Sequence, residues 1–155
     1  MDIMSECPFG IHDLSRNGLD PRTSLARFNM PIELGIFLGL GYDEASCKQT
    51  KSMIFLDANP RDYEKTASDL KGRDPRIHSN DPDRLITHIR EWLRSLGLSG
   101  TIPGGKEITR RYRLFLKDIP DLLTQVHLHE SEISKPEHFL SWCDLVTEWL
   151  AAASF

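Results

Sequence analysis

Two acidic residues in the first quarter of the chain have the character and the setting of catalytic carboxylates. Asp13 follows the apolar run that begins at Phe9, and Glu33 lies within the stretch Arg27–Gly35. A carboxylate held in place can act as a nucleophile, or it can stabilise the oxocarbenium-like transition state through which glycosidic bonds break. Such chemistry also needs polar groups that orient the sugar, and Asn29 is one candidate. We therefore take Glu33 as the first catalytic candidate and Asp13 as the second.

The sequence around these residues predicts the elements that position them. Phe9–Leu14 and Ser52–Asp57 are short, mostly apolar runs of the kind found in strands buried on both faces, and Arg76–His78 is a short third candidate. Pro31 is expected to open a helix, which would put Glu33 in the first turn, where the helix dipole favours an anion.

The predicted fold class is α/β, a short parallel sheet of about three strands with flanking helices and a helical C-terminal half. In such a sheet the carboxyl ends of the strands and the starts of the following helices border one crevice. We therefore expect Asp13, Asp57 and the start of the Glu33 helix to converge there. Asp13 would orient a sugar hydroxyl or take part in proton transfer.

Each of these residues also has a purely structural explanation. Glu33 suits a capping or dipole role, and Asp13 suits the capping of a loop. An Asx turn before the helix that Pro60 opens explains Asp57 as economically as a ligand contact does. Arg27 would either meet a ligand phosphate or pair with Asp13.

Composition narrows the classes of function. The formal net charge is −4 and the pI is near 5.8, which makes nucleic acid and anionic membranes poor candidates for the main partner, because phosphate binding is chiefly electrostatic. The sequence contains neither a signal-peptide pattern nor an apolar run of the roughly 18 residues that span a bilayer. We therefore expect a cytoplasmic protein. A basic cluster leaves nucleic-acid binding as the weakest alternative; it comprises Arg110, Arg111, Arg113 and Lys117.

Neither a metal site nor a disulfide framework is expected. The three cysteines lie far apart and form no CxxC. His127 and His129 have no second ligand pair elsewhere in the chain, so we interpret them as surface histidines. We expect a single domain over residues 1–155, with an α/β nucleotide-binding-like part at 1–79 and a helical part at 80–155.

Three segments resemble a group of small uncharacterised bacterial proteins, similar to the nucleoside 2-deoxyribosyltransferase-like and TIR-like nucleotide-binding fold. They are Gly10-Ile11-His12-Asp13-Leu14-Ser15-Arg16, Arg27-Phe28-Asn29-Met30-Pro31-Ile32-Glu33-Leu34-Gly35 and Ser68-Asp69-Leu70-Lys71-Gly72-Arg73-Asp74. The resemblance implies that the sheet is flavodoxin-like or Rossmann-like. It also implies that, as in enzymes of that fold, a helix-borne Glu attacks or stabilises C1 of a ribose or deoxyribose, and Glu33 matches that position. The expected ligand contacts are Ser15, Arg16, Arg27, Asn29 and Asp57.

Members of that group begin earlier, with a strand, a phosphate-facing loop, a helix and a second strand, and this chain is expected to lack that unit. Phe9–Leu14 would then be an edge strand. An exposed apolar edge favours pairing with another chain, and hence a homodimer, or with residues 1–8. A truncated gene or lost activity would account for the difference as well.

These observations predict a protein that binds a nucleotide or nucleoside and acts through Glu33 as an N-glycosidase, NAD hydrolase or deoxyribosyltransferase-like enzyme. No cofactor is expected, and NAD or a nucleotide would be the substrate. The alternative is a non-catalytic nucleotide-sensing or protein-interaction module with a degenerate site.

Overall fold

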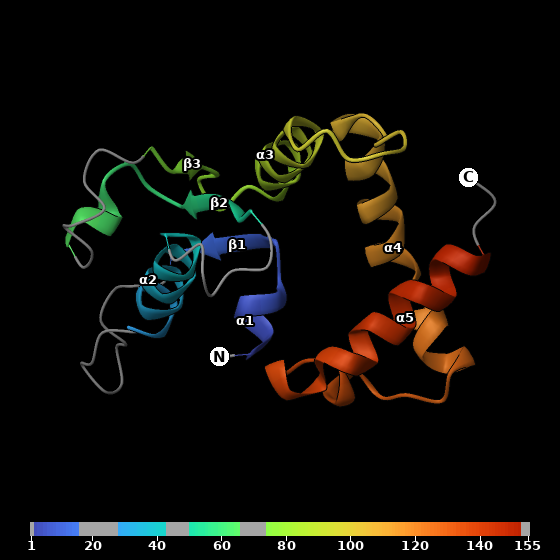
Figure 1. Ribbon diagram of the computed structural model, residues 1–155. Helices are drawn as coiled ribbons and strands as arrows, with labels where there is room; N and C mark the ends of the chain where they lie inside the picture. Colours follow the sequence, from blue (N-terminus) through green and yellow to red (C-terminus); the bar gives the residue numbers. More distant parts are fainter. Residues whose placement is uncertain (1, 16–27, 43–49, 66–73, 153–155) are drawn as a thin grey trace. The chain divides into compact units, whose positions relative to one another are not determined.

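A computed structural model describes residues 2–15, 28–42, 50–65 and 74–152 of the chain. It divides the chain into two compact units, Met1–Gly105 and Lys106–Phe155. The first unit contains a parallel sheet with flanking helices, and the second is helical (Figure 1). The predicted α/β fold is thus confirmed. The boundary predicted between residues 79 and 80 separates the strands from the helices that follow. It does not separate the two compact units, because the helix after residue 80 packs with the sheet.

The sheet has the predicted strands in the predicted parallel arrangement. Its strands are β1 (Phe9–Asp13), β2 (Ser52–Asp57) and β3 (Arg76–Ile77), in the order β1-β2-β3. Phe9 pairs with Ser52, and Leu56 pairs with Arg76. β1 is therefore an edge of the sheet, as the sequence predicted.

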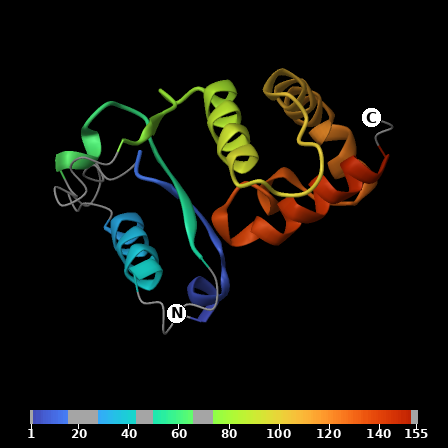
Figure 2. The same cartoon turned by 45° about the horizontal axis from the view of Figure 1, so that its top comes forward.

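Helices cover the two faces of this sheet (Figure 2). Helix α2 (Asn29–Tyr42) lies on one face, where it closes a core of buried apolar side chains made of Leu14, Leu34, Phe55 and Tyr63. Helix α3 (Pro82–Ser95) lies on the other face. Its Trp92 ring meets Phe9 edge-on at 6.1 Å, and the Trp92 indole N–H donates to the Ser52 hydroxyl at 3.4 Å.

Helix α2 begins two residues before Pro31. The N–H of Ile32 donates to the carbonyl of Phe28 at 3.0 Å, which places Asn29 in the first turn. Pro31 fits there because the first amides of a helix have no intrahelical partner to lose. The prediction that Glu33 lies in the first turn is therefore wrong: that turn contains no acidic residue, and Glu33 falls in the second turn.

The chain before β1 forms the short helix α1 (Asp2–Glu6) and does not add a strand to the sheet. The Lys51 ammonium group holds the end of this helix by donating to the carbonyls of Met4 at 2.7 Å, Ser5 at 3.2 Å and Cys7 at 2.8 Å. The carboxyl end of a helix attracts a cation. Residues 2–6 are thus occupied in a helix, and no described strand pairs with the outer edge of β1.

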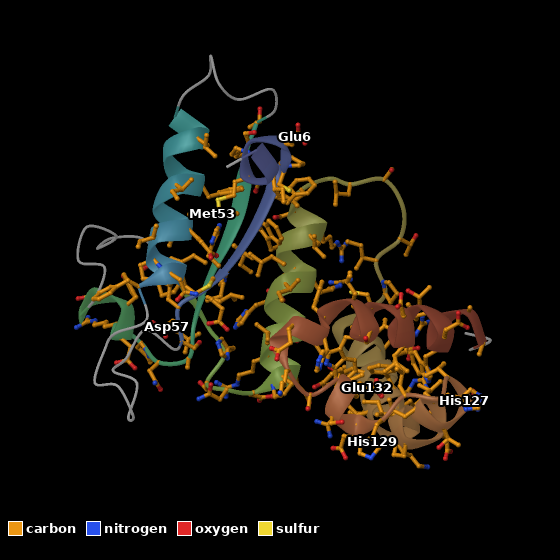
Figure 3. All side chains as sticks on the ribbon, turned by 90° about the horizontal axis from the view of Figure 1, so that it is seen from below. Glu6, Met53, Asp57, His127, His129 and Glu132 are labelled. Carbon is orange, nitrogen blue, oxygen red and sulfur yellow. The ribbon has the colours of Figure 1, made fainter. Side chains whose placement is uncertain are left out.

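The second unit contains α4 (Gly105–Gln125), η3 (Glu130–Glu132), η4 (Pro136–His138) and α5 (Phe139–Ala152). Its core is apolar and includes Phe115, Leu122, Leu145 and Trp149. His129 caps η3 together with Glu132 in a capping box, and Figure 3 labels both residues. No helix in the described ranges is both long enough and apolar enough to cross a membrane.

Candidate functional site

Asp13 anchors a polar cluster at the carboxyl end of β1. Its Oδ1 atom accepts the Ser15 backbone N–H at 3.0 Å and also accepts the Ser15 hydroxyl. The Asp13 side chain is 42% exposed. Within the described part of the chain, its second oxygen, Oδ2, makes no hydrogen bond. Asp13 therefore caps the turn with Oδ1, and no described residue occupies Oδ2.

His78 completes this cluster from the far side of the sheet. It follows β3 directly and is 5% exposed. Its Nε2 atom lies 2.7 Å from the Ser15 hydroxyl and 3.4 Å from Asp13 Oδ1. We call Asp13, Ser15 and His78 the Asp13 cluster. The sequence predicted the strand Arg76–His78 that brings His78 here but gave this histidine no role, although a polar last residue of a predicted strand was the available signal.

Hydrogen bonds fix the direction of the protons in the Asp13 cluster. The backbone N–H of Asn80 donates to His78 Nδ1 at 3.2 Å, so the proton of the neutral ring resides on Nε2. That N–H points to Ser15, whose hydroxyl in turn donates to Asp13. His78 in this state cannot remove the Ser15 proton. The arrangement therefore suits ligand binding better than a serine nucleophile activated by histidine.

The backbone after His78 is held in an unusual conformation. Ser79 and Asn80 have φ angles of 54° and 56°, in the left-handed region that residues with a side chain seldom adopt. Each such residue costs about 1–2 kcal/mol, and strain of this kind persists where the surroundings hold it. Here the His78 carbonyl accepts the Asp81 N–H at 2.8 Å. This turn delivers the Asn80 amide to the His78 ring.

Glu33 lies on α2, half-buried, and it does not join the Asp13 cluster. Within the described residues, its carboxylate forms neither a hydrogen bond nor an ion pair. Its negative charge favours a higher pKa for His12, a residue of β1. No described backbone amide is therefore bonded to this carboxylate, and its catalytic role stays a prediction.

Asp57 is turned into its own loop. It is fully buried, at the end of β2 beside η1 (Asp62–Lys65), where Figure 3 labels it. Its oxygens accept the N–H of Asn59 at 3.4 Å and of Tyr63 at 3.0 Å. Burial raises the pKa of Asp57, and the donated backbone amides oppose that rise. This geometry explains a structural Asp57, and its predicted ligand contact stays a prediction.

The other predicted ligand contacts are distributed differently. Ser15 belongs to the Asp13 cluster, and Asn29 is an exposed residue at the start of α2. Arg16 and Arg27 lie outside the described residues. Of the set named from the sequence, the described structure therefore joins Asp13 and Ser15.

A cavity of about 570 Å³ lies beside η1, a size that would accommodate a nucleoside. Its lining includes Pro60, Arg61, Tyr63, Glu64 and Ile77, and it contains neither Asp13 nor Glu33. Within the described ranges, no group of three or more His, Cys, Asp or Glu side chains is placed to hold a metal ion.

The basic cluster on α4 is partly neutralised by its own helix. Glu107 accepts the Arg110 guanidinium at 2.7 Å and 2.8 Å and the Arg111 guanidinium at 2.7 Å. These hydrogen bonds, from Arg110 and then Arg111, lower the pKa of Glu107 to about 2. An ion-paired face of this kind attracts a phosphate backbone less than free arginines would.

His12 is a buried polar residue that the sequence did not single out. It lies under α2, with its ring 5.2 Å from that of Phe37, and it is 6% exposed. Both ring nitrogens are buried without a hydrogen-bond partner among the described residues. Gly10 makes room for this ring, because a Cβ atom at position 10 would lie 2.7 Å from His12 Nε2. Burial lowers the pKa of His12, and the charge of Glu33 opposes that change.

Acid should therefore destabilise the fold through His12. The unfolded chain binds a proton with an ordinary pKa of 6.5, whereas the folded chain resists protonation. Stability is then unaffected above pH 6.5 and falls as the pH drops from there towards the lowered pKa of the folded state. Urea unfolding of wild type and His12→Leu between pH 7.5 and pH 5 measures this.

We expect His12→Leu to flatten the pH dependence in that interval, and His127→Asn, at an exposed position with φ 56°, to leave it unchanged. Equal slopes for wild type and His12→Leu would contradict the inference.

No protein-family model, curated protein or solved structure matches this chain. The part of the resemblance that the structure bears out is an α/β fold with a three-stranded parallel sheet.

Proposed function

We propose that the protein binds a nucleoside or nucleotide at the carboxyl edge of its sheet and cleaves the N-glycosidic bond of that ligand. The observation that carries this proposal is the Asp13 cluster, in which residues 65 positions apart along the chain meet at the ends of β1 and β3. Ligands of open α/β sheets bind outside the carboxyl ends of the strands.

The chemistry of the Asp13 cluster supports a ligand that carries hydroxyl groups. An acid at a strand end can accept hydrogen bonds from ribose hydroxyls, as in dinucleotide-binding folds. Asp13 has a partly exposed side chain, and its Oδ2 atom accepts no hydrogen bond from the described residues. Its other oxygen is fixed by Ser15, so the carboxylate is oriented before the ligand arrives. A ligand then has less conformational freedom to remove on binding.

Glu33 would supply the reaction. In this proposal its carboxylate attacks or stabilises C1 of the sugar as the bond to the base breaks. Asn29, exposed near the same end of α2, would hydrogen-bond the ligand, and Arg27 would meet a phosphate. NAD, nucleosides and mononucleotides are therefore the substrates to test.

Asp13→Asn is the variant that tests binding. The amide keeps the size of the side chain and one acceptor for Ser15, but it loses the negative charge and an acceptor for the ligand. We expect about tenfold weaker binding, or about 1.4 kcal/mol, with the unfolding midpoint near that of wild type. Titration calorimetry against nucleosides, mononucleotides and NAD measures the affinity.

Asp144→Asn is the matched control, because Asp144 is exposed on α5 in the other unit. The proposal fails if wild type binds none of these ligands, or if both variants bind as tightly as wild type does.

A non-catalytic nucleotide-sensing module is the second candidate function. The separation of Glu33 from the hydrogen bonds of the Asp13 cluster favours it, because a catalytic carboxylate is usually oriented by neighbouring groups. Tight binding of a nucleotide with no release of base would support this alternative.

A further inference from the structure

The outer edge of β1 carries a regular set of backbone groups. The N–H of Leu14 donates to the Leu56 carbonyl, and the Ser52 N–H donates to the Pro8 carbonyl, both at 2.9 Å. In a parallel pair the residues of a strand alternate between facing the partner and facing away. Because Pro8 and Leu14 face β2, the N–H and C=O groups of Phe9, Ile11 and Asp13 point outward. No described strand pairs with them.

The side chains along this edge are unusually exposed for a strand of a small α/β unit. Phe9 is 40% exposed and Ile11 is 51% exposed, although both belong to the sheet face that α3 approaches. An edge that combines unpaired backbone groups with apolar side chains is a template for another strand. Asp13 provides the one charge on β1.

We propose that β1 pairs in antiparallel fashion with β1 of a second copy of this chain, about a two-fold axis at Ile11. In this register Ile11 lies opposite Ile11 of the second copy, and Phe9 lies opposite Asp13. These are the narrow pairs in which both residues exchange hydrogen bonds, so every outward group of β1 finds a partner. The sheet becomes continuous across the dimer, with six strands.

Symmetry and charge favour a second copy of β1 as the pairing strand, and they favour this register. An isologous interface must pair a surface with itself, and the three outward residues are spaced symmetrically about Ile11. Sliding the strands by two residues in either direction leaves one outward residue of each copy without its counterpart in β1. The symmetric register also places the two Asp13 carboxylates at opposite ends of the pairing, away from each other. It brings Ile11 against its own copy, as an apolar cross-strand pair.

The dimer also bears on the Asp13 cluster. Phe9 of the second copy would lie directly across from Asp13, on the same face of the sheet. Its ring would form an apolar wall beside the Asp13 carboxylate. This dimer does not depend on the proposed glycosidic reaction, and the two can fail separately.

Ile11→Lys tests the dimer, with Ile3→Lys as its matched control. Ile3 is 80% exposed on α1 and does not belong to β1. Sedimentation velocity should give wild type and Ile3→Lys about twice the chain mass of 17.7 kDa, and Ile11→Lys the mass of one chain. Far-UV circular dichroism should be the same for all three. Ile11→Pro is a second disrupting variant, because it removes an outward N–H and leaves the hydrogen bonds to β2 in place.

The register is tested with a single cysteine at position 11, after Cys7, Cys47 and Cys143 are replaced by serine. The two Cα atoms would lie about 5.5 Å apart, within the range that a disulfide spans. We expect mild oxidation to link the Ile11→Cys chains in pairs and to leave Ile3→Cys unlinked. A monomeric wild type, a dimer that survives both Ile11→Lys and Ile11→Pro, or a failure of Ile11→Cys to cross-link would overturn the proposal.

Discussion

Replacing Glu33 with glutamine should lower the release of base from a nucleoside or from NAD by at least about a hundredfold, or about 2.7 kcal/mol of transition-state stabilisation. Glutamine keeps the shape of the side chain but cannot attack C1 or balance the positive charge that develops on the sugar. Chromatographic detection of free base at saturating substrate measures the effect.

The fold should tolerate this change. Glu33 is half-buried and makes no hydrogen bond among the described residues. The unfolding midpoint of Glu33→Gln should therefore stay close to that of wild type. Glu148→Gln is the matched control, since Glu148 is exposed on α5. Equal rates for wild type and Glu33→Gln would remove Glu33 from the mechanism. Binding by a wild type that releases no base would instead favour the non-catalytic module.

The sequence predicted the sheet because its strands are unusual in composition. β2 is apolar from Met53 to Leu56, as expected of a strand that is covered on both faces, and it ends in Asp57. Alternation with helices then left parallel pairing as the simplest connection, and the observed order β1-β2-β3 follows it. Burial and chain connectivity are properties of whole segments, so a single sequence reveals them.

The individual site residues were harder to predict because their roles depend on distant partners. Asp13 and Asp57 both end a strand, and nothing in the sequence separates them. In the structure Asp13 receives a serine and a histidine from outside its strand, whereas Asp57 is enclosed by the amides of its own loop. His78 was missed because its contact with Asp13 spans 65 residues. The start of α2 was misplaced because Pro31 is equally suited to any position in the first turn.

The contrast between the two acids predicts that Asp57→Ala loses stability. Asp57 is fully buried, and its two oxygens accept the amides of Asn59 and Tyr63. Removing them breaks a buried hydrogen bond from the Tyr63 N–H, at a cost of about 1–3 kcal/mol, and a part-buried one from the Asn59 N–H. We expect a loss of about 3 kcal/mol in the free energy of unfolding, measured by urea denaturation.

Asp81→Ala provides the comparison that isolates burial. Asp81 caps α3 by accepting the Asp83 N–H at 2.9 Å, but its side chain is 46% exposed, so water can replace the lost bond. The loss there should be about 1 kcal/mol. If Asp57→Ala were no more destabilising than Asp81→Ala, the backbone amides would not explain why an acid is buried at the end of β2. A loss of nucleotide binding in a stably folded Asp57→Ala protein would then return Asp57 to the ligand site, since a carboxylate kept in a low-dielectric position without a structural benefit is typical of a functional one.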